Sequence, residues 1–214
     1  MRIDILCTNP AHPVVPVLRG WMAKRASAHH VRLIHDKSEL AYGDILYLVS
    51  CSQLIGREDR ARYAHVLVLH ASNLPEGRGW SPHVWDILAG KEDLTASLLT
   101  AEDSLDTGAI WAKRRFLVPK HALYDEINDL LFQAELDLMD LGMEMVAAGE
   151  APVPQTAQAG SYYPRRTPED SRLDPTRSLA DLFDQIRVAD PDRFPAFFEM
   201  HEHTYVVTLK KRES

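Results

Sequence analysis

The chain has 214 residues and a net charge of −7, with 24 lysines and arginines against 31 aspartates and glutamates. This length allows one sizeable hydrophobic core with a small appendage rather than two full-sized domains. The 45% hydrophobic and 26% charged composition excludes disordered and fibrous classes. The acidic balance argues against sequence-independent binding of nucleic acid, and the sequence has no run of about 18 apolar residues that would form a membrane-spanning helix. We therefore expect a globular protein whose partners include neither nucleic acid nor a membrane.

The N-terminus and the cysteines bear on the compartment. The apolar stretch Ile3–Cys7 is interrupted by charge and is too short for a signal peptide. Cys7 and Cys51 form neither a disulfide framework nor a zinc-binding spacing. We expect a cytoplasmic protein with reduced thiols.

Short apolar runs alternate with helix-like segments over the first hundred residues. The expected strands are residues 3–8, 30–35, 45–50 and 65–70, and the expected helices are residues 14–25 and 57–64. Continuous rather than alternating apolar runs are typical of a parallel sheet covered on both faces. Strands separated by helices predict right-handed crossovers and an α/β fold, namely an open, doubly wound (Rossmann-like) sheet with helices on both faces.

The middle of the chain begins with a loop at residues 73–82 that is dense in turn-forming residues. Ser81 followed by Pro82 predicts the start of a helix through residues 84–89, with Ser81 as its N-cap. Two strands are expected at residues 95–101 and 109–118, and a long helix with an apolar stripe is expected at about residues 123–148.

The composition changes near residue 150. Seven of the 13 prolines lie between Pro152 and Pro195, which predicts an irregular segment that wraps around the first part of the chain. Within it, residues 178–188 read as a helix capped by Ser178, and residues 204–210 as an edge strand or hairpin arm. The expected parts are residues 1–150 as the main α/β domain and residues 151–214 as a proline-rich wrap with a small C-terminal helix plus β-hairpin appendage. We expect residues 151–214 to pack on the first part.

His70 and Asp106 are candidates for chemistry. His70 ends the expected strand 65–70, and ligands of open α/β sheets bind in the crevice outside the carboxyl ends of the strands. Asp106 lies in the loop between the next two strands, and a carboxylate that reaches a histidine fixes its tautomer and raises its basicity. Spacing alone leaves open whether the two side chains meet, and a single histidine near a strand end is more often structural than catalytic.

Two motifs occur in order along the chain. The first is residues 70–75 (His-Ala-Ser-Asn-Leu-Pro) with residues 77–79 (Gly-Arg-Gly), and the second is residues 104–108 (Ser-Leu-Asp-Thr-Gly). Together they resemble the hallmark pattern of the folate-dependent formyltransferases, which include methionyl-tRNA formyltransferase, glycinamide ribonucleotide transformylase and the sugar N-formyltransferases. Residues 162–171 are similar to an arginine-proline-acid motif of the tRNA and sugar branches. The resemblance spans about residues 45–198, and two ordered motifs are a stronger signal than either alone.

The resemblance implies transfer of a formyl group from the co-substrate N10-formyltetrahydrofolate to a primary amine. His70 is then expected to stabilise the developing oxyanion or to relay the proton lost by the amine, while Asp106 orients and polarises it. The residues implied to contact the pterin through their backbone groups are Gln53, Leu54, Ile55, Ala101, Glu102 and Asp103. No metal is implied.

One position departs from the family pattern. The family has an asparagine two residues before the histidine, and here that position is Val68. Loss of one oxyanion donor typically costs about 2.7–4 kcal/mol of transition-state stabilisation. Either another group supplies the donor, with Asn73 and Ser72 as candidates, or the reaction depends more on His70, or the protein is catalytically weak.

The amine acceptor is inferred from the resemblance and from charge. The tRNA enzymes carry an additional C-terminal domain for which 214 residues leave no room, and a charge of −7 matches tRNA phosphates poorly. The purine-pathway enzymes lack a segment like residues 165–170, whereas the sugar branch has it. Residues 69–82 are similar to formyltransferases of pseudaminic-acid-type pathways, which implies a nucleotide-linked amino sugar, specifically a UDP-linked 4-amino sugar. A different small amine, or a folate- or nucleotide-binding homologue with weak activity, remains the alternative.

Further residues are candidates for substrate binding or assembly. Arg165 and Arg166 suit a diphosphate, and Tyr163 suits stacking on a base, although a structural linker paired to Glu169 or Asp170 is slightly favoured. Trp80 is a candidate for lining the sugar pocket, against the alternative of core packing. The triplet at residues 201–203 (His-Glu-His) is expected to form a solvated hairpin tip rather than a metal site. Strand 109–118 and the terminal strand offer edges through which a homodimer could form.

Overall fold

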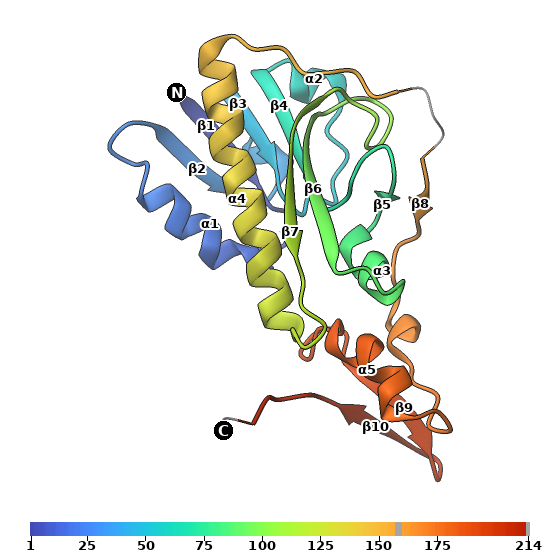
Figure 1. Ribbon diagram of the computed structural model, residues 1–214. Helices are drawn as coiled ribbons and strands as arrows, with labels where there is room; N and C mark the ends of the chain where they lie inside the picture. The colour runs from blue at the N-terminus through green and yellow to red at the C-terminus, as the bar shows by residue number, and fades with distance from the viewer. Residues whose placement is uncertain (157–159, 213–214) are drawn as a thin grey trace.

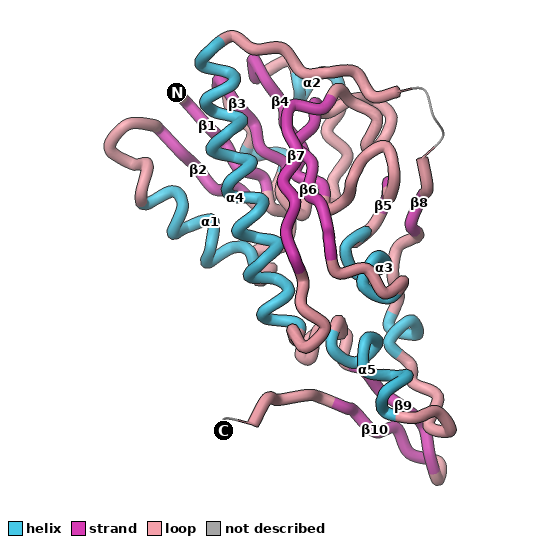
Figure 2. The backbone as a smooth tube through the Cα atoms, viewed as in Figure 1, coloured by secondary structure: helices cyan, strands magenta, loops and turns pink. Residues whose placement is uncertain are grey.

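The computed structural model describes residues 1–156 and 160–212, and its centre is a six-stranded sheet (Figures 1 and 2). The strands are ordered β2-β1-β3-β4-β6-β7 across the sheet. Their bounds are β1 Arg2–Leu6, β2 His30–Ile34, β3 Gly43–Leu48, β4 Tyr63–His70, β6 Asp93–Thr100 and β7 Ile110–Leu117. The Rossmann-like α/β class expected from the apolar runs is therefore confirmed.

The sheet is mixed rather than wholly parallel. Strands β1 to β4 are parallel, as their continuous apolar runs predict. Strand β6 runs antiparallel to β4, and β7 runs antiparallel to β6. The loop of residues 101–109 joins β6 directly to β7 without a crossover helix. Because β6 runs antiparallel to β4, this loop begins beside the middle of β4, where the Ala101 amide donates to the Val66 carbonyl.

The two longer helices pack on the same face of the sheet (Figure 1). Helices α1 (Val14–Ala23) and α4 (Tyr124–Ala148) share one hydrophobic core with β1, β3, β4 and β6. The opposite face carries a second, smaller core, over which lie the short helix α2 (Arg57–Arg60), the single 3₁₀ turn at Lys37–Glu39 and loops. Helices were expected on both faces of the sheet, but this second face carries only short elements and loops.

Alternation along β4 decides on which face His70 lies. Leu67 and Leu69 face the core under α1 and α4, whereas Val66 and Val68 face the smaller core. Because successive strand residues point to opposite faces, His70 shares the face of Val66 and Val68. The candidate histidine therefore lies on the face that the long helices leave uncovered.

The loop after β4 is held by a second, two-stranded sheet. Its strands are β5 (Arg78–Gly79) and β8 (Tyr162–Tyr163), which pair in parallel at the right of Figure 1. Helix α3 (Pro82–Leu88) follows β5. Ser81 is the N-cap of α3 and Pro82 its first residue, as predicted, but Ser81 adopts a left-handed conformation (φ 47°) and its side chain makes no cap hydrogen bond.

The C-terminal region carries its own small core. After a 3₁₀ turn at Pro168–Ser171 comes α5 (Leu179–Arg187), which Ser178 caps by accepting from the Asp181 amide, as predicted. Strands β9 (Ala196–Met200) and β10 (His203–Val207) form an antiparallel hairpin that extends below the main sheet (Figure 1). His201 and Glu202 form its tip, both with positive φ, so the expected hairpin tip is observed. Residues 157–159 and 213–214 of this region lie outside the described residues.

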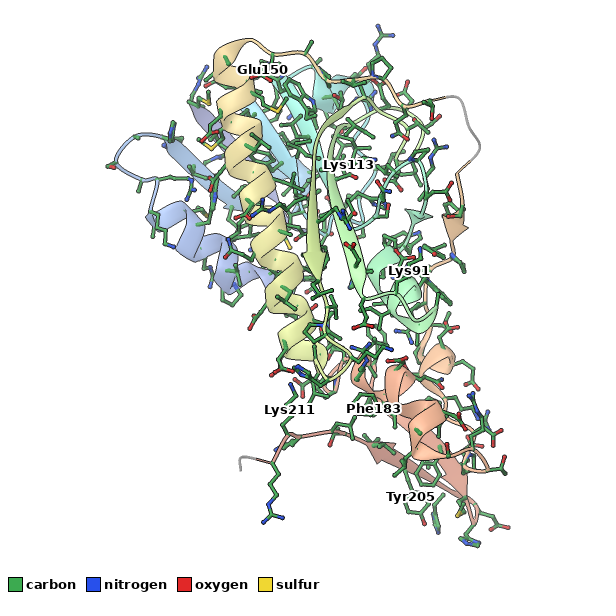
Figure 3. All side chains as sticks on the ribbon, viewed as in Figure 1. Lys91, Lys113, Glu150, Phe183, Tyr205 and Lys211 are labelled. Atoms are coloured by element: carbon green, nitrogen blue, oxygen red, sulfur yellow. The ribbon has the colours of Figure 1, made fainter. Side chains whose placement is uncertain are left out.

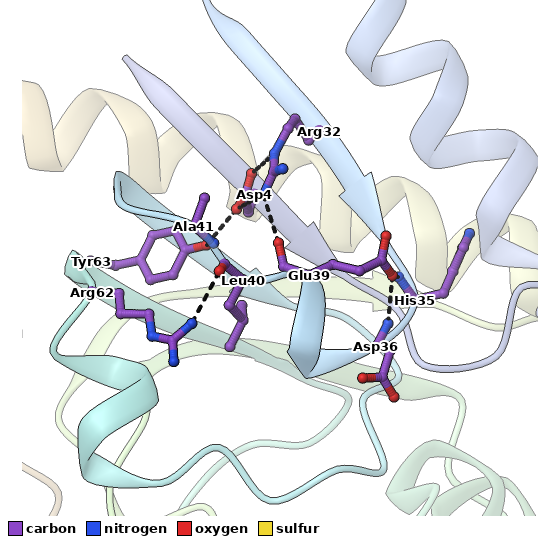
Figure 4. Close-up of polar contacts among 9 residues, drawn as sticks. All are labelled: Asp4, Arg32, His35, Asp36, Glu39, Leu40, Ala41, Arg62 and Tyr63. Carbon is purple, nitrogen blue, oxygen red and sulfur yellow. Dashed lines mark hydrogen bonds and ion pairs between the residues drawn. The ribbon is translucent and has the colours of Figure 1, made fainter.

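A polar network ties the first strands together below the smaller core (Figure 4). The guanidinium of Arg32 donates from Nε and Nη2 to the two carboxylate oxygens of the buried Asp4, at 2.8 and 2.6 Å, and the Tyr63 hydroxyl donates to the same carboxylate. Burial alone would raise the pKa of Asp4, but the Arg32 and Tyr63 hydrogen bonds outweigh it and hold that pKa below its usual value. Strands β1, β2 and β4 are thereby cross-linked through one side chain.

None of the helices in the described part of the chain is long and apolar enough to cross a membrane.

Helix α4 carries a buried carboxyl group that, unlike Asp4, lacks stabilising partners among residues 1–156 and 160–212. Glu135 is 7% exposed, its Oε2 atom has no hydrogen-bond partner within the described residues, and burial raises the pKa of its carboxyl to about 8. The side chain is therefore protonated at neutral pH in the folded protein, whereas in the unfolded chain it ionises near pH 4.5.

We expect Glu135→Gln to be more stable than the wild type, with a difference that grows as the pH rises. The pKa is raised on folding, so the contribution of Glu135 is fully present below about pH 4.5 and is lost as the pH rises toward 8. At about 1.4 kcal/mol per pKa unit, the difference reaches on the order of 3 kcal/mol at pH 7. Urea denaturation between pH 4.5 and 8 measures it, with the exposed Glu144→Gln on the same helix as control. A difference that stays constant with pH contradicts the assignment.

Candidate active site

His70 and Asp106 meet although they are 36 residues apart in the sequence. His70 ends β4, and its Nδ1 lies 3.6 Å from Asp106 Oδ1, longer than a hydrogen bond but within ion-pair distance. The two side chains are 8% and 12% exposed, so their interaction is shielded from solvent. The other ring nitrogen, Nε2, lies 2.9 Å from the Gly77 carbonyl oxygen. A neutral imidazole has one N–H and can donate to only one of these two acceptors at a time.

The loop that carries Asp106 is tightly folded. Asp106 itself has φ 56°, in the left-handed region that a residue other than glycine rarely adopts. Two residues later, a Cβ atom on Gly108 would lie 1.8 Å from the Thr100 carbonyl oxygen, so only glycine lets the loop lie against the end of β6. The backbone amide of Gly79 donates to Asp106 Oδ2 at 2.9 Å. The two motif loops are thus joined through the Asp106 carboxylate.

The predicted substrate-binding residues gather around β5 and β8. The Arg165 guanidinium lies over the Trp80 ring, 4.9 Å from its centroid. The Tyr163 ring stacks on Trp85 with centroids 6.0 Å apart and an interplanar angle of 15°, and its hydroxyl donates to Asp86 Oδ1 at 2.8 Å. Burial is the main cause that raises the pKa of Tyr163 to about 12. These aromatic rings are half-buried.

The acids expected as partners of the arginines bind elsewhere. Asp170 accepts from the Thr167 amide, and Glu169 pairs with Arg172 at 2.9 Å. Arg166 donates only to the Asp170 carbonyl, its Nε atom is buried without a partner, and burial lowers the pKa of its guanidinium. Within the described residues, neither Arg165 nor Arg166 forms an ion pair with a carboxylate.

The two candidates for the missing oxyanion donor have different surroundings. Asn73 is exposed, and its Oδ1 accepts from Lys113 Nζ at 2.7 Å; the same ammonium donates to the Leu74 carbonyl at 2.6 Å. Burial lowers the pKa of Lys113. Ser72 is 1% exposed, and its Oγ has no hydrogen-bond partner within the described residues. Lys113 extends from β7, the edge strand, toward the motif loop (Figure 3).

The residues expected at the pterin lie on two loops that one arginine links. Arg60 donates from Nη1 to the Ile55 carbonyl at 2.8 Å and from Nη2 to Asp103 Oδ1 at 2.5 Å. Ala101 and Ile55 both contact the smaller core, while Leu54 and Glu102 are exposed. The Gln53 side chain faces away toward the 3₁₀ turn, where it accepts from the Lys37 amide and donates to Asp36.

Val68 is half-buried beside these loops. It packs against the smaller core together with Cys51 and Ala101. Because Val68 and His70 are two residues apart on one strand, they share a face. The side of His70 where the family has an asparagine is therefore apolar here.

Several residues near the site carried no sequence signal. His83, the second residue of α3, has a buried Nδ1 without a partner among the described residues, and burial lowers its pKa to about 4, so its imidazole is neutral. Arg60 and Lys113 act through tertiary contacts that no spacing pattern reveals. Gly79 was within the recognised motif, but its amide bond to Asp106 depends on the fold.

Comparison with known proteins supports the motif resemblance. The family model described as formyl transferase matches residues 7–140, which include both motif loops.

The chain belongs to the formyl transferase family.

Among curated formyl transferases, the methionyl-tRNA formyltransferase of Halorhodospira halophila is 28% identical over 181 residues, which is 78% of this chain and 58% of that protein. The chain therefore spans less than two thirds of the length of this relative.

Two solved structures share the fold at low sequence identity. HypX from Aquifex aeolicus in complex with tetrahydrofolic acid has a TM-score of 0.80 at 19% identity, covering 98% of this chain and 37% of that one. A sugar N-formyltransferase from a Shewanella species has a TM-score of 0.72 at 17% identity, covering 100% of this chain and 99% of that one. The likeness confirms the fold of the formyl transferase domain.

We expect Lys113→Met to loosen the motif loop at residues 73–77. The substitution removes both hydrogen bonds from the ammonium and leaves the Asn73 and Leu74 oxygens without that donor, at a cost of about 1 kcal/mol or more. Amide hydrogen exchange of residues 73–77 measures the effect as faster exchange. Arg115→Met on the same strand, which breaks only an exposed pair with Asp93, is the control. Unchanged exchange in Lys113→Met refutes the role of this contact.

Proposed function

We propose that the protein transfers a formyl group from N10-formyltetrahydrofolate to the primary amine of a nucleotide-linked amino sugar. The observation that carries the proposal is the pairing of His70 with Asp106 inside two family motifs. Residues 1–150 are proposed as the catalytic unit, and residues 151–214 as a wrap and hairpin that contribute the acceptor side.

The residues of the two linked loops fit a folate co-substrate. The backbone groups of Leu54 and Glu102 make no hydrogen bond to other described residues, and Val68 with Ala101 offers an apolar surface beside them. A flat heterocycle with an amide edge is recognised by such backbone groups and apolar contact. Bound formyltetrahydrofolate supplies the formyl group. HypX, which shares the fold, binds tetrahydrofolate, and this supports the same class of co-substrate here.

His70 is the proposed catalytic residue. The amine nitrogen forms a bond to the formyl carbon, the bond between that carbon and folate N10 breaks, and N10 takes up a proton as tetrahydrofolate leaves. The His70 imidazole takes the proton that the attacking amine loses, or donates to the oxygen on which negative charge develops. Asp106 fixes the ring orientation through the 3.6 Å contact with Nδ1. In this structure Nδ1 faces Asp106 and Nε2 faces the Gly77 carbonyl. One of these two contacts must therefore open before His70 can exchange a proton with the substrate.

The acceptor side is proposed to be built by Trp80, Tyr163, Arg165 and Arg166. Guanidinium groups without carboxylate partners suit the oxygens of a diphosphate, and aromatic rings at the same place suit a base or a sugar face. Asn73, whose carbonyl oxygen is bound by Lys113, is proposed to assist only through its amide nitrogen. The sugar N-formyltransferase neighbour supports an amino sugar, whereas the curated relatives act on methionyl-tRNA; a UDP-linked 4-amino sugar of a pseudaminic-acid-type pathway is the specific proposal.

We expect His70→Ala and Asp106→Asn each to lower formyl transfer by about 100-fold or more, because general acid–base catalysis contributes about 10²–10⁴-fold. Formyl gain by mass spectrometry with formyltetrahydrofolate and a panel of nucleotide-linked amino sugars measures it. The exposed His121→Ala serves as control. Near-native turnover in both variants refutes the catalytic assignment. Transfer to methionyl-tRNA but to no sugar refutes the acceptor class alone.

A second candidate function is a folate- or nucleotide-binding protein with weak activity. The apolar side of His70 at Val68 favours it, since the family donor is replaced there by a valine. Tight folate binding by calorimetry without product from any amine supports this candidate over the first.

A homodimer through the C-terminal hairpin is part of the proposal. Strand β10 has no neighbour on its outer edge within the described residues, and Met200, Tyr205 and Val206 are 41%, 43% and 59% exposed. Figure 3 shows Tyr205 on the hairpin, away from the main sheet. The other expected edge, β7, carries the exposed Lys113, Arg114 and Arg115, which disfavour pairing with a second copy. The hairpin is therefore the preferred edge.

We expect Val206→Lys to convert the dimer to a monomer, because a charge on the edge strand opposes pairing of two copies. Multi-angle light scattering measures the mass. Leu117→Lys, at an equally exposed position on β7, is the matched control and should leave the dimer intact. A monomeric wild type, or a dimer lost only in Leu117→Lys, contradicts the assignment.

A further inference from the structure

Gln155 lies where the proline-rich segment passes the Asp106 loop. Two residues earlier, Val153 and Ile110 exchange a pair of backbone hydrogen bonds of 2.8 Å, which anchor the segment at the start of β7. Gln155 is half-buried immediately beyond this anchor. A side chain from the C-terminal part of the chain is therefore held beside the proposed catalytic loop.

Both polar atoms of the Gln155 amide form hydrogen bonds. Its nitrogen Nε2 donates to the backbone carbonyls of Asp106 and Gly108, at 2.9 and 2.8 Å, and its oxygen Oε1 accepts from Arg78 Nη2 at 3.3 Å. Backbone carbonyls can only accept and a guanidinium can only donate, so these partners fix which way the amide faces. One side chain thus bonds both motif loops at once.

The bonds fall at the strained part of the loop. Asp106 has φ 56°, and such a conformation in a non-glycine residue persists only when the surroundings hold it. The Gln155 amide holds the carbonyl of Asp106 itself and that of Gly108 two residues later. On the side-chain end of the same residue, Oδ2 accepts from the Gly79 amide and Oδ1 faces His70.

We propose that Gln155 is a positioning residue that sets the Asp106 carboxylate against His70. The proposal rests on the proposed function, in which Asp106 orients His70. Gln155 contacts neither His70 nor the reacting atoms; it acts by fixing the backbone from which Asp106 extends. Displacement of a catalytic group by about 1 Å can cost about 100-fold in rate.

Three variants separate the donors of Gln155 from its bulk. Gln155→Ala removes all three hydrogen bonds. Gln155→Glu keeps the size and the acceptor for Arg78 but loses both donors, so it should be as impaired as Gln155→Ala if the donors matter. Thr156→Ala, at the exposed neighbouring position, is the matched control.

The kinetic test is a double-mutant cycle with Asp106. We expect Gln155→Ala and Gln155→Glu to lower kcat about 10- to 100-fold, with KM for formyltetrahydrofolate changed less than about twofold. In the Asp106→Asn background, Gln155→Ala should lower kcat by less than about twofold further, because its effect passes through Asp106. The proposal is overturned if the losses in kcat multiply in the double variant. It is also overturned if Gln155→Ala keeps native turnover or if Gln155→Glu behaves like the wild type.

An activity-independent measurement keeps the proposal testable if formyl transfer is not the reaction. The Gly79 amide donates to Asp106 Oδ2, so its hydrogen exchange, followed by NMR, reports where the carboxylate lies. We expect faster Gly79 exchange in Gln155→Ala and Gln155→Glu but not in Thr156→Ala. Unchanged exchange overturns the positioning role. Absence of turnover in the wild type, together with faster exchange in the variants, refutes the proposed function and leaves the positioning role standing.

Discussion

Asp106 uses its two carboxylate oxygens on two different partners: Oδ2 accepts from the Gly79 amide, and Oδ1 faces His70 Nδ1. These contacts join the loop after β4 to the loop after β6, which belong to antiparallel neighbours in the sheet. They require Asp106 in a left-handed conformation and a glycine at position 108, where a Cβ would collide with the Thr100 carbonyl. The contact between Asp106 and His70 therefore depends on a short, strained loop as well as on the strand that carries His70.

The unequal covering of the sheet explains why a site can form beside His70. Both longer helices bury the face of β4 that carries Leu67 and Leu69. The face of Val66, Val68 and His70 is covered only by short elements and loops, whose backbone groups remain at the surface. Parallel strands normally need helices on both faces; here the smaller core replaces one helical layer, and the space is taken by the loops proposed to bind the co-substrate.

The secondary-structure elements that depend on nearby residues could be predicted from the sequence. The strands of the main sheet, the long helix and the Ser178 cap followed from apolar runs and capping residues. The antiparallel direction of β6 could not be predicted, because a continuous apolar run fits a buried strand in either direction. Ser81 is the predicted N-cap of α3, but its left-handed backbone and the lack of a side-chain cap hydrogen bond could not be predicted from the Ser-Pro pair. The bonds made by Arg60 and Gln155 were beyond prediction, because each joins loops that only the folded chain brings together.

Charge is distributed unevenly over this acidic chain. Arg78, Arg165 and Arg166 form no ion pair with a carboxylate within the described residues, whereas the nearby Glu169 pairs with Arg172. Guanidinium groups without carboxylate partners suit the few phosphates of the proposed nucleotide-linked acceptor, while a net charge of −7 opposes the approach of a long polyanion at low salt. The Debye length of about 10 Å at 0.1 M salt makes the local arginines count for more than the distant acids. For the proposed acceptor, contacts within that distance of these arginines therefore matter more than the net charge of the whole chain.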